Sequence, residues 1–174
     1  MKINMATLDE IEATNIARTI ATLHVASWRA SYRGILTDDY LDYQVEADRL
    51  HHWQAHVPEL KSGLGEIYMA TLESAPVGFV CIEIDPEQDL GAYVDNLHVL
   101  PQAQGQGIGT LLLTAAGCWA QKHGASKLHL HVYEDNLPAR QFYARDGWHT
   151  VAREIYDLPG GGQAAALTLT KKLS

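Results

Sequence analysis

The chain has 174 residues, 47% hydrophobic and 20% charged, which is the balance of one globular domain with its own core. Its formal net charge of -8 at pH 7 disfavours tight binding to nucleic acid or to an anionic membrane, because both depend on Lys and Arg. No stretch approaches the roughly 20 apolar residues of a membrane span, and the first residues lack the apolar core of a secretory signal, so we expect a cytoplasmic protein.

The first third of the chain has helical periodicity. Residues 11–28 place their apolar side chains on one helix face, and Gly34 interrupts this pattern. Thr37 predicts a new helix start, because its side-chain oxygen can accept hydrogen bonds from open N–H groups. A further helix over residues 45–57 is expected to stop before Pro58, since the residue before a proline disfavours the helical conformation.

The middle of the chain has the composition of strands. Residues 67–72 and 77–84 are rich in strand formers and flank a turn, which is typical of a hairpin. A turn at residues 85–89 leads to a third strand over residues 92–100, which Pro101 ends.

The last third alternates between helices and strands. Helices are expected over residues 108–122 and 137–145, and strands over residues 127–132, 148–156 and 164–173. This order predicts an α/β (α+β) fold with one mixed, largely antiparallel sheet of about six or seven strands, flanked by about four or five helices. We expect residues 1–174 to form a single domain.

Cysteines and histidines do not suggest a metal site or a covalent nucleophile. Cys81 and Cys118 each lie in an apolar run, where a thiol behaves as a small hydrophobic side chain. His52 and His56 are four residues apart on an expected helix, but zinc needs three or four converging ligands and no spaced Cys/His set is present. We therefore expect packed or solvated histidines and no metal.

A glycine-rich turn separates the third strand from the next helix. Its residues are Gln104, Gly105, Gln106, Gly107, Ile108, Gly109 and Thr110. Glycines let a ligand approach the backbone, and the open N–H groups at a helix start suit a phosphate or pyrophosphate. The alternative is a tight turn that binds nothing. The turn lacks the lysine of a nucleoside triphosphate loop and the glycine spacing of a dinucleotide-binding fold.

Two spaced motifs resemble the GNAT acetyltransferase superfamily. The first motif consists of Gln104, Gly107 and Gly109 after the strand that ends at Pro101. The second motif consists of Asn136, Ala139, Tyr143, Gly147 and Trp148. The resemblance covers most of the chain from Trp28 to Leu173, and it implies a GNAT-type fold and acetyl-CoA as the cosubstrate, with no metal.

The resemblance also implies where acetyl-CoA lies. In GNAT proteins the strand before the glycine turn separates from its neighbour, and the pantetheine arm lies along it. The backbone of Leu97, His98 and Val99 would then hold this arm and the thioester carbonyl, while residues 104–110 would bind the pyrophosphate. Asn136 would contact the cofactor, cap the following helix, or do both.

Catalytic roles follow from the same resemblance. Tyr143 matches the family's general acid, which protonates the departing thiolate, although a tyrosine here could also be a core residue. Many members have a carboxylate at the position of Tyr93, so the base must differ here. Asp95 is the nearest carboxylate, Glu83 on the adjacent strand is another, and a water chain is a third possibility. Strict alternation places Tyr93, Asp95, Leu97 and Val99 on one strand face and His98 on the other, where it would pack or meet solvent.

We therefore expect an enzyme that transfers acetyl from acetyl-CoA to a primary amine by direct attack in a ternary complex. A non-catalytic acyl-CoA sensor or interaction module is the alternative, and a longer acyl chain is a further one. The acceptor is a small-molecule amine or a peptide amine. Its expected contacts are Trp28, Tyr32, Glu83 and Tyr93.

Three regions of the expected domain have different tasks. Residues 1–60 form the helical acceptor side, residues 66–135 the sheet with the acetyl-CoA core, and residues 136–174 the last helix and strands. A homodimer is possible through residues 160–173, if they form an exposed edge strand.

Overall fold

The computed structural model describes residues 3–9, 15–84 and 91–174. Its strands are β1 (Ile3–Ala6), β2 (Gly65–Leu72), β3 (Ala75–Glu83), β4 (Ala92–Val99), β5 (Lys127–Tyr133), β6 (His149–Asp157) and β7 (Gln163–Lys172). Its α-helices are α1 (Ile16–Ser31), α2 (Val45–Glu59), α3 (Ile108–Lys122) and α4 (Leu137–Arg145). Two π-helical turns, η1 (Tyr40–Gln44) and η2 (Leu60–Leu64), flank α2, and a 3-10 turn, η3 (Pro101–Ala103), follows β4.

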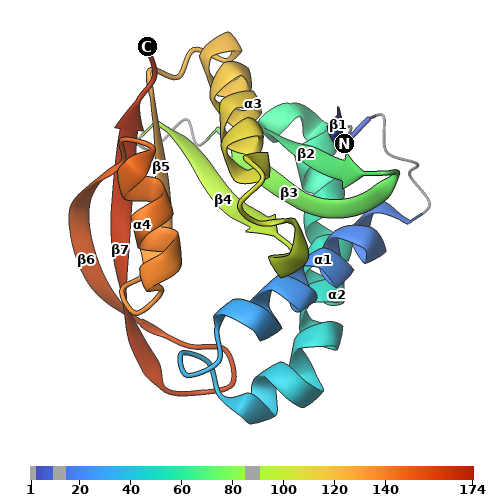
Figure 1. Ribbon diagram of the computed structural model, residues 1–174, viewed down its shortest axis with the longest axis vertical. Helices are drawn as coiled ribbons and strands as arrows, with labels where there is room; N and C mark the ends of the chain where they lie inside the picture. Colours follow the sequence, from blue (N-terminus) through green and yellow to red (C-terminus); the bar gives the residue numbers. More distant parts are fainter. Residues whose placement is uncertain (1–2, 10–14, 85–90) are drawn as a thin grey trace.

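The strands form one mixed sheet. In the described residues it has seven strands, in the order β1-β2-β3-β4-β5-β7-β6 (Figure 1). Every neighbouring pair is antiparallel except β4 and β5, which are parallel. With the four α-helices that the described residues form, this is the fold class that the sequence predicts.

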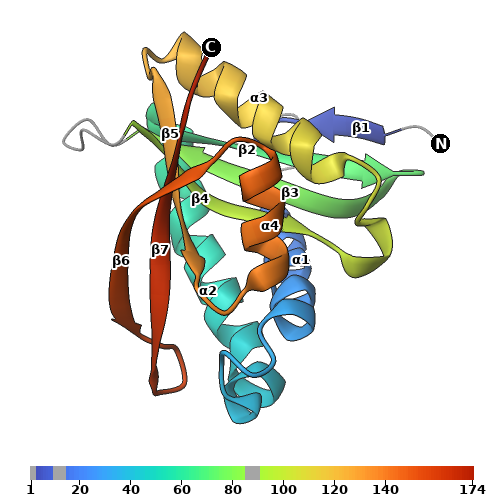
Figure 2. The same ribbon diagram turned by 60° about the vertical axis from the view of Figure 1, so that its left-hand side comes forward.

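Helices cover both faces of the sheet (Figures 1 and 2). Helices α1 and α2 pack on one face, where Trp53 and Phe79 are fully buried. Helices α3 and α4 lie on the other face, α3 over Val80 and Ile82 of β3 and α4 nearer to β5 and β7. Successive side chains of a strand point to opposite faces, which is why β3 supplies apolar residues to both layers. Among the described residues, none of the helices combines the length and apolarity that a membrane crossing requires.

Helix α1 is amphipathic, as the sequence predicts. Ile16, Ile20 and Leu23 are buried on one face of it. The helix extends to Ser31, three residues beyond its expected end. Residues 11–14, where the expected helix begins, lie outside the described part of the chain.

Helix α2 continues past the proline that was expected to end it. The Tyr40 N–H donates to Thr37 Oγ1 at 3.3 Å, as expected for a helix start. From η1 through α2 into the start of η2 the chain stays helical, until Gly63 with φ of 97°, so the two expected helices form one element. Pro58 lies in the last turn of α2, where the Leu60 N–H still donates to the His56 carbonyl, and the helix tolerates the one missing N–H.

The N-terminal strand is absent from our sequence prediction. Strand β1 has only four residues and pairs at the sheet edge with β2, so it carries little periodicity. The expected hairpin of β2 and β3 is confirmed, and its turn uses Glu73 and Ser74 with positive φ. The turn expected at residues 85–89 lies outside the described residues.

The last strand is not the edge of the sheet. We expected residues 160–173 to offer an exposed edge, but β7 lies between β5 and β6, so this expectation is wrong. Strand β6 is the edge strand on this side of the sheet, opposite the β1 edge, and all nine of its residues are exposed. A homodimer therefore stays a prediction, with β6 as the strand that has a free edge.

Candidate active site

The two parallel strands separate soon after they meet. Only Ala92 and Tyr93 of β4 pair with β5, opposite Leu128 and His129. Beyond this point β4 pairs only with β3 and β5 only with β7, and the two strands diverge (Figure 1). A cavity of about 1100 Å³ lies between them. The free edge of β4 inside this cavity can pair with an extended ligand, as an added strand would.

The wall of the cavity contains most of the predicted cofactor-binding residues. They are Leu97, His98, Val99, Gln104, Gly105, Gly107, Ile108, Gly109, Thr110 and Asn136. Gln106 does not line the cavity, and its amide donates to the Gln102 carbonyl at 3.3 Å. The glycine turn and the free edge of β4 thus meet in one space.

The glycine turn exposes main-chain donors. Gly105 and Gly107 have φ of 74° and 78°, the left-handed region that favours glycine. The Gln104 side chain donates to the Val99 carbonyl at 3.0 Å and ties the turn to the end of β4. Within the described chain, the N–H groups of residues 105–110 donate to no protein acceptor. They are available to phosphate oxygens, in the positive field of the α3 N-terminus.

Gly109 has a second role that the motif does not reveal. A Cβ at this position would lie 3.1 Å from Cζ of Phe142, which is closer than ordinary van der Waals contact. The missing side chain therefore lets α4 approach the first turn of α3. This contact helps to place α4 against the cavity.

Helix α4 carries Tyr143 into the cavity wall. The helix begins at an Asn136 cap, whose Oδ1 accepts from the Ala139 N–H at 3.3 Å, so the capping role is confirmed. The Tyr143 ring is buried against Trp148, with centroids 5.7 Å apart, and it lines the cavity. Burial raises the pKa of the Tyr143 phenol, so the phenol keeps its proton at neutral pH and can donate it.

A β-bulge in β4 changes the position of Asp95. Cys81 of β3 pairs with Asn96, but the next residue of β3, Ile82, pairs with Val94. Asp95 is therefore the extra residue between two paired ones. Such a bulge interrupts alternation, so residues on its two sides no longer follow one period-2 pattern.

The bulge overturns our assignment of strand faces. Directly opposed residues of an antiparallel pair share a face, and Tyr93 pairs with Glu83 while His98 pairs with Phe79. Tyr93, Asp95 and His98 therefore face the α1–α2 layer, whereas Leu97 and Val99 face the α3 layer. His98 does pack, as expected, with its ring centroid 4.4 Å from that of His24 and its Nδ1 2.9 Å from Ser27 Oγ.

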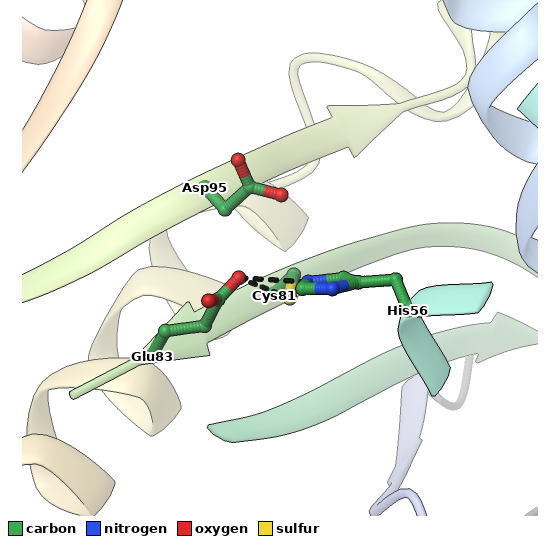
Figure 3. A group of neighbouring side chains, drawn as sticks. All are labelled: His56, Cys81, Glu83 and Asp95. Carbon is green, nitrogen blue, oxygen red and sulfur yellow. Dashed lines mark hydrogen bonds and ion pairs between the residues drawn. The ribbon is translucent and has the colours of Figure 1, made fainter. Parts of the chain in front are cut away.

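Asp95 lies in a cluster of polar groups from three elements. His56 comes from α2, Cys81 and Glu83 come from β3, and one donor atom of each of the four lies within 4.8 Å of the others (Figure 3). His56 Nε2 lies 2.8 Å from Glu83 Oε1, and Cys81 Sγ lies 3.8 Å from the same oxygen. Asp95 lines the cavity but the other three residues do not, so Glu83 is not in the wall where we expected an acceptor contact.

The cluster sets the ionisation of its members. Burial, followed by the nearby Glu83 charge, raises the pKa of Asp95 to about 6. The hydrogen bond to Glu83 raises the pKa of His56 to about 9, so His56 is a cation at neutral pH. Burial raises the pKa of the Cys81 thiol, which keeps it protonated. Cys81 is buried as predicted, whereas Cys118 is exposed and the expectation of packing fails there.

The same four groups could hold a metal ion only after losing protons. A metal needs a neutral imidazole and a thiolate, but His56 is a cation and Cys81 a thiol in this arrangement. The His56 charge is already matched by Glu83 and by Glu59, whose Oε2 lies 3.1 Å from His56 Nδ1. The donors fit a charge network better than a metal centre.

Aromatic rings surround the part of the cavity away from the glycine turn. Trp28 of α1 and Tyr32, the residue just after α1, line it together with Tyr93, as expected for acceptor contacts. Tyr133 and Tyr156 also line it, and sequence analysis missed both because they belong to β5 and β6, far along the chain. Only the fold brings these rings together.

Comparisons with other sequences agree with this geometry. A sequence model of the acetyltransferase (GNAT) family matches residues 24–148. A probable N-acetyltransferase of Mycobacterium tuberculosis is 29% identical over 143 residues, which cover 82% of this chain and 80% of that protein. An uncharacterized N-acetyltransferase of Bacillus subtilis is 28% identical over 159 residues, which cover 90% of this chain and 87% of that protein.

Solved structures share the fold. The PaiA N-acetyltransferase of Thermoplasma acidophilum, in complex with coenzyme A, has a TM-score of 0.74 at 21% identity, with 99% of each chain covered. A GCN5-related N-acetyltransferase of Rhodopseudomonas palustris has a TM-score of 0.75 at 25% identity, with 99% of this chain and 97% of that chain covered. The whole described sheet and its helices thus have counterparts in these proteins.

Proposed function

The chain belongs to the acetyltransferase (GNAT) family, and we propose that it transfers the acetyl group of acetyl-CoA directly to a primary amine in a ternary complex. The observation that carries this proposal is the cavity between β4 and β5. It contains the free edge of β4, the donors of the glycine turn, a protonated phenol and a half-buried carboxyl group in one space.

Acetyl-CoA fits the donors that the cavity offers. The N–H groups of residues 105–110 would bind the pyrophosphate, which the open donors and the α3 dipole favour. The pantetheine arm carries amide groups, and these would pair with the main chain of Leu97 and Val99 on the free edge of β4. A main-chain N–H of this strand would also stabilise the oxyanion that forms on the thioester carbonyl.

The reaction needs a proton acceptor and a proton donor. The acceptor enters as an ammonium ion, and Asp95 takes one proton from it to free the nitrogen lone pair. The nitrogen then forms a bond to the thioester carbon, the carbon–sulfur bond breaks, and Tyr143 donates its proton to the departing thiolate. A second proton leaves the amide nitrogen and restores Tyr143. One proton per turnover passes from Asp95 to solvent.

The acceptor is a small cationic amine in this proposal. Asp95 and Asp157 line the cavity, while Arg145 is its one Lys or Arg among the described lining residues. Electron-rich rings attract cations, and the Trp28 ring already carries one, with Arg49 Cζ 4.7 Å from its centroid, so the Tyr32 ring is the better partner for a substrate ammonium group. Residues 1–60, which carry both rings, would then form the acceptor side.

A thiol-release assay with acetyl-CoA and a panel of amines tests the proposal. We expect turnover with cationic amines, and a decrease in kcat of about 100-fold or more in Tyr143→Phe with acetyl-CoA affinity retained, because the leaving thiolate loses its proton donor. Tyr43→Phe is the control, since Tyr43 is 82% exposed. Tight acetyl-CoA binding without turnover on any amine would instead favour a sensor, and absence of coenzyme A binding would contradict the whole proposal.

A further inference from the structure

His56 has two carboxylate partners but no place in the cavity wall. It lies on α2, with its side chain 17% exposed. Its Nε2 donates to Glu83 Oε1 at 2.8 Å and its Nδ1 donates to Glu59 Oε2 at 3.1 Å. Both ring nitrogens are therefore fixed, and the ring is held beside the two carboxyl groups of Glu83 and Asp95 (Figure 3).

We propose that His56 is a positioning residue for the general base: its ring fixes the Glu83 side chain beside Asp95, so that the proton of the substrate ammonium goes to Asp95. This inference rests on the proposed function. It assigns a role to a side chain of the helical layer that never touches the substrate.

The geometry determines which carboxyl group receives the proton. Two carboxylates this close repel each other, and such a pair tends to share one proton. Glu83 Oε1 is already contacted by both the His56 ring and the Cys81 thiol, at 2.8 Å and 3.8 Å. Among the described residues, Asp95 has no cation at hydrogen-bond distance, but its carboxyl group faces the cavity, so the proton is held where the amine arrives.

The other groups around the cluster do not compete with this assignment. From α2, His52 packs on His56 with ring centroids 5.3 Å apart, and burial lowers the pKa of His52 to about 4, so it is neutral.

Two further neighbours come from the strands. From β2, Glu66 acts on Cys81 through its charge, but its Oε1 accepts from the N–H groups of Leu8 and Ile67. From β4, Tyr93 and Asn96 both contact the Asp95 carboxyl group and favour its charged form. His56 is therefore the one described cation beside the carboxyl pair.

Opposite shifts of the pH profile test the proposal. We would measure kcat/KM for acetyl-CoA at saturating amine as a function of pH, with one amine for all variants. His56→Gln removes the cation, so Asp95 keeps its proton to higher pH. The acidic limb of the kcat/KM profile should therefore move to higher pH by about one unit. Glu83→Gln removes the negative charge beside Asp95, so the acidic limb should move to lower pH. His56→Lys restores a cation and should return the limb toward its original position.

His51→Gln is the matched control, because His51 is exposed on the same helix. Its profile should equal that of the unchanged protein. A limb that does not move in His56→Gln, or that moves down, would overturn the proposal. Should His56→Gln fail to fold, His56→Asn removes the same cation and should give the same upward shift.

A second measurement does not depend on turnover. NMR titration of the Asp95 side-chain carboxyl carbon should show the same upward shift in His56→Gln and none in His51→Gln, even if no amine is acetylated. In that case the proposed function fails while the role of His56 is still tested. Zn²⁺ that remains with the protein through gel filtration, and that Cys81→Ser releases, would overturn the inference, because a metal takes the imidazole lone pair that the proton occupies.

Discussion

The raised pKa of Asp95 makes this side chain a suitable base and lowers the stability of the fold when the carboxyl group is charged. An ordinary aspartate has a pKa of 3.8, but burial and the Glu83 charge raise that of Asp95 to about 6. A base with this pKa is mostly deprotonated at neutral pH and still holds a proton well enough to take one from an ammonium ion. The cost is a charge in a site that water solvates poorly.

Replacement of Asp95 by Asn should therefore stabilise the protein and inactivate it. A raised carboxyl pKa contributes stability that is complete below about pH 4 and is lost as the pH rises through about 6, so the charged carboxylate destabilises the fold at pH 8. We expect Asp95→Asn to increase the free energy of unfolding at pH 8 by about 1–3 kcal/mol and to lower kcat/KM by about 100-fold or more.

Urea unfolding at several pH values checks the first part of this expectation, and the thiol-release assay checks the second. The gain in stability should shrink as the pH falls toward 4, where Asp95 is protonated in the folded state as well. A loss of stability at pH 8 would contradict the assigned charge state.

At the scale of elements, the start of α3 is where local backbone geometry creates a binding site. Gly107 is the N-cap of α3 and has φ of 78°, and the N–H groups beside it have no protein acceptor in the described chain. Gly124, just past the other end of the same helix, has φ of 86°. A Cβ at either glycine would meet no atom within 4 Å, so the two positions differ in their place in the fold and not in their local strain.

Substitutions at Gly107 and Gly124 separate the effect on acetyl-CoA binding from the effect on the free energy of unfolding. Gly107→Ala and Gly124→Ala should each lower the free energy of unfolding by about 1 kcal/mol, because alanine is strained in the left-handed region. Only Gly107→Ala should weaken acetyl-CoA binding, by about 10-fold, because a change of φ at this residue turns the N–H groups away from the pyrophosphate. Calorimetric titration with coenzyme A measures the difference. Equal affinities in the two variants would exclude the turn as the phosphate site.

On the scale of the whole molecule, the net negative charge and the lining of the cavity both favour a cationic acceptor. The chain carries a net charge of -8, and the cavity opens between the sheet and helices of both layers, with carboxyl groups and aromatic rings in its wall. A negative field raises the local concentration of cations and of cationic substrates. Acetyl-CoA is itself an anion, so its binding must depend on the directed donors of the glycine turn.

Salt should therefore affect the two substrates in opposite directions. The screening length falls from about 30 Å at 0.01 M to about 3 Å at 1 M, which removes long-range attraction. Over this range we expect KM for a cationic amine to rise several-fold and KM for acetyl-CoA to stay constant or fall. Initial rates at varied amine and fixed saturating acetyl-CoA, and the reverse, give both constants. A KM for acetyl-CoA that rises as steeply as that of the amine would contradict the charge argument.

Much of the fold could be predicted because its signals are local. The glycine turn and the bounds of α3 and α4 follow from residues close in sequence, such as the Asn136 cap and Gly107. Hydrophobic periodicity likewise predicts β2, β3 and β5 to within a few residues. The predictions that failed depend on longer range: β1 is short and pairs with a strand about 60 residues later, and Pro58 is tolerated within one continuous helical element.

The class of fold and the position of the glycine turn could be predicted from the amino-acid sequence, because backbone chemistry and residue spacing decide them over a few residues, and the family could be recognised from the resemblance of two motifs. The arrangement of the site depends on contacts between distant segments, which exist only in the folded chain. The β4 bulge depends on pairing with β3, so it is invisible in the alternation that placed Asp95 and Leu97 on one face. His56 and Glu83 are 27 residues apart and meet only because α2 packs on the sheet, and a hydrogen bond between distant segments leaves no local pattern in either of them.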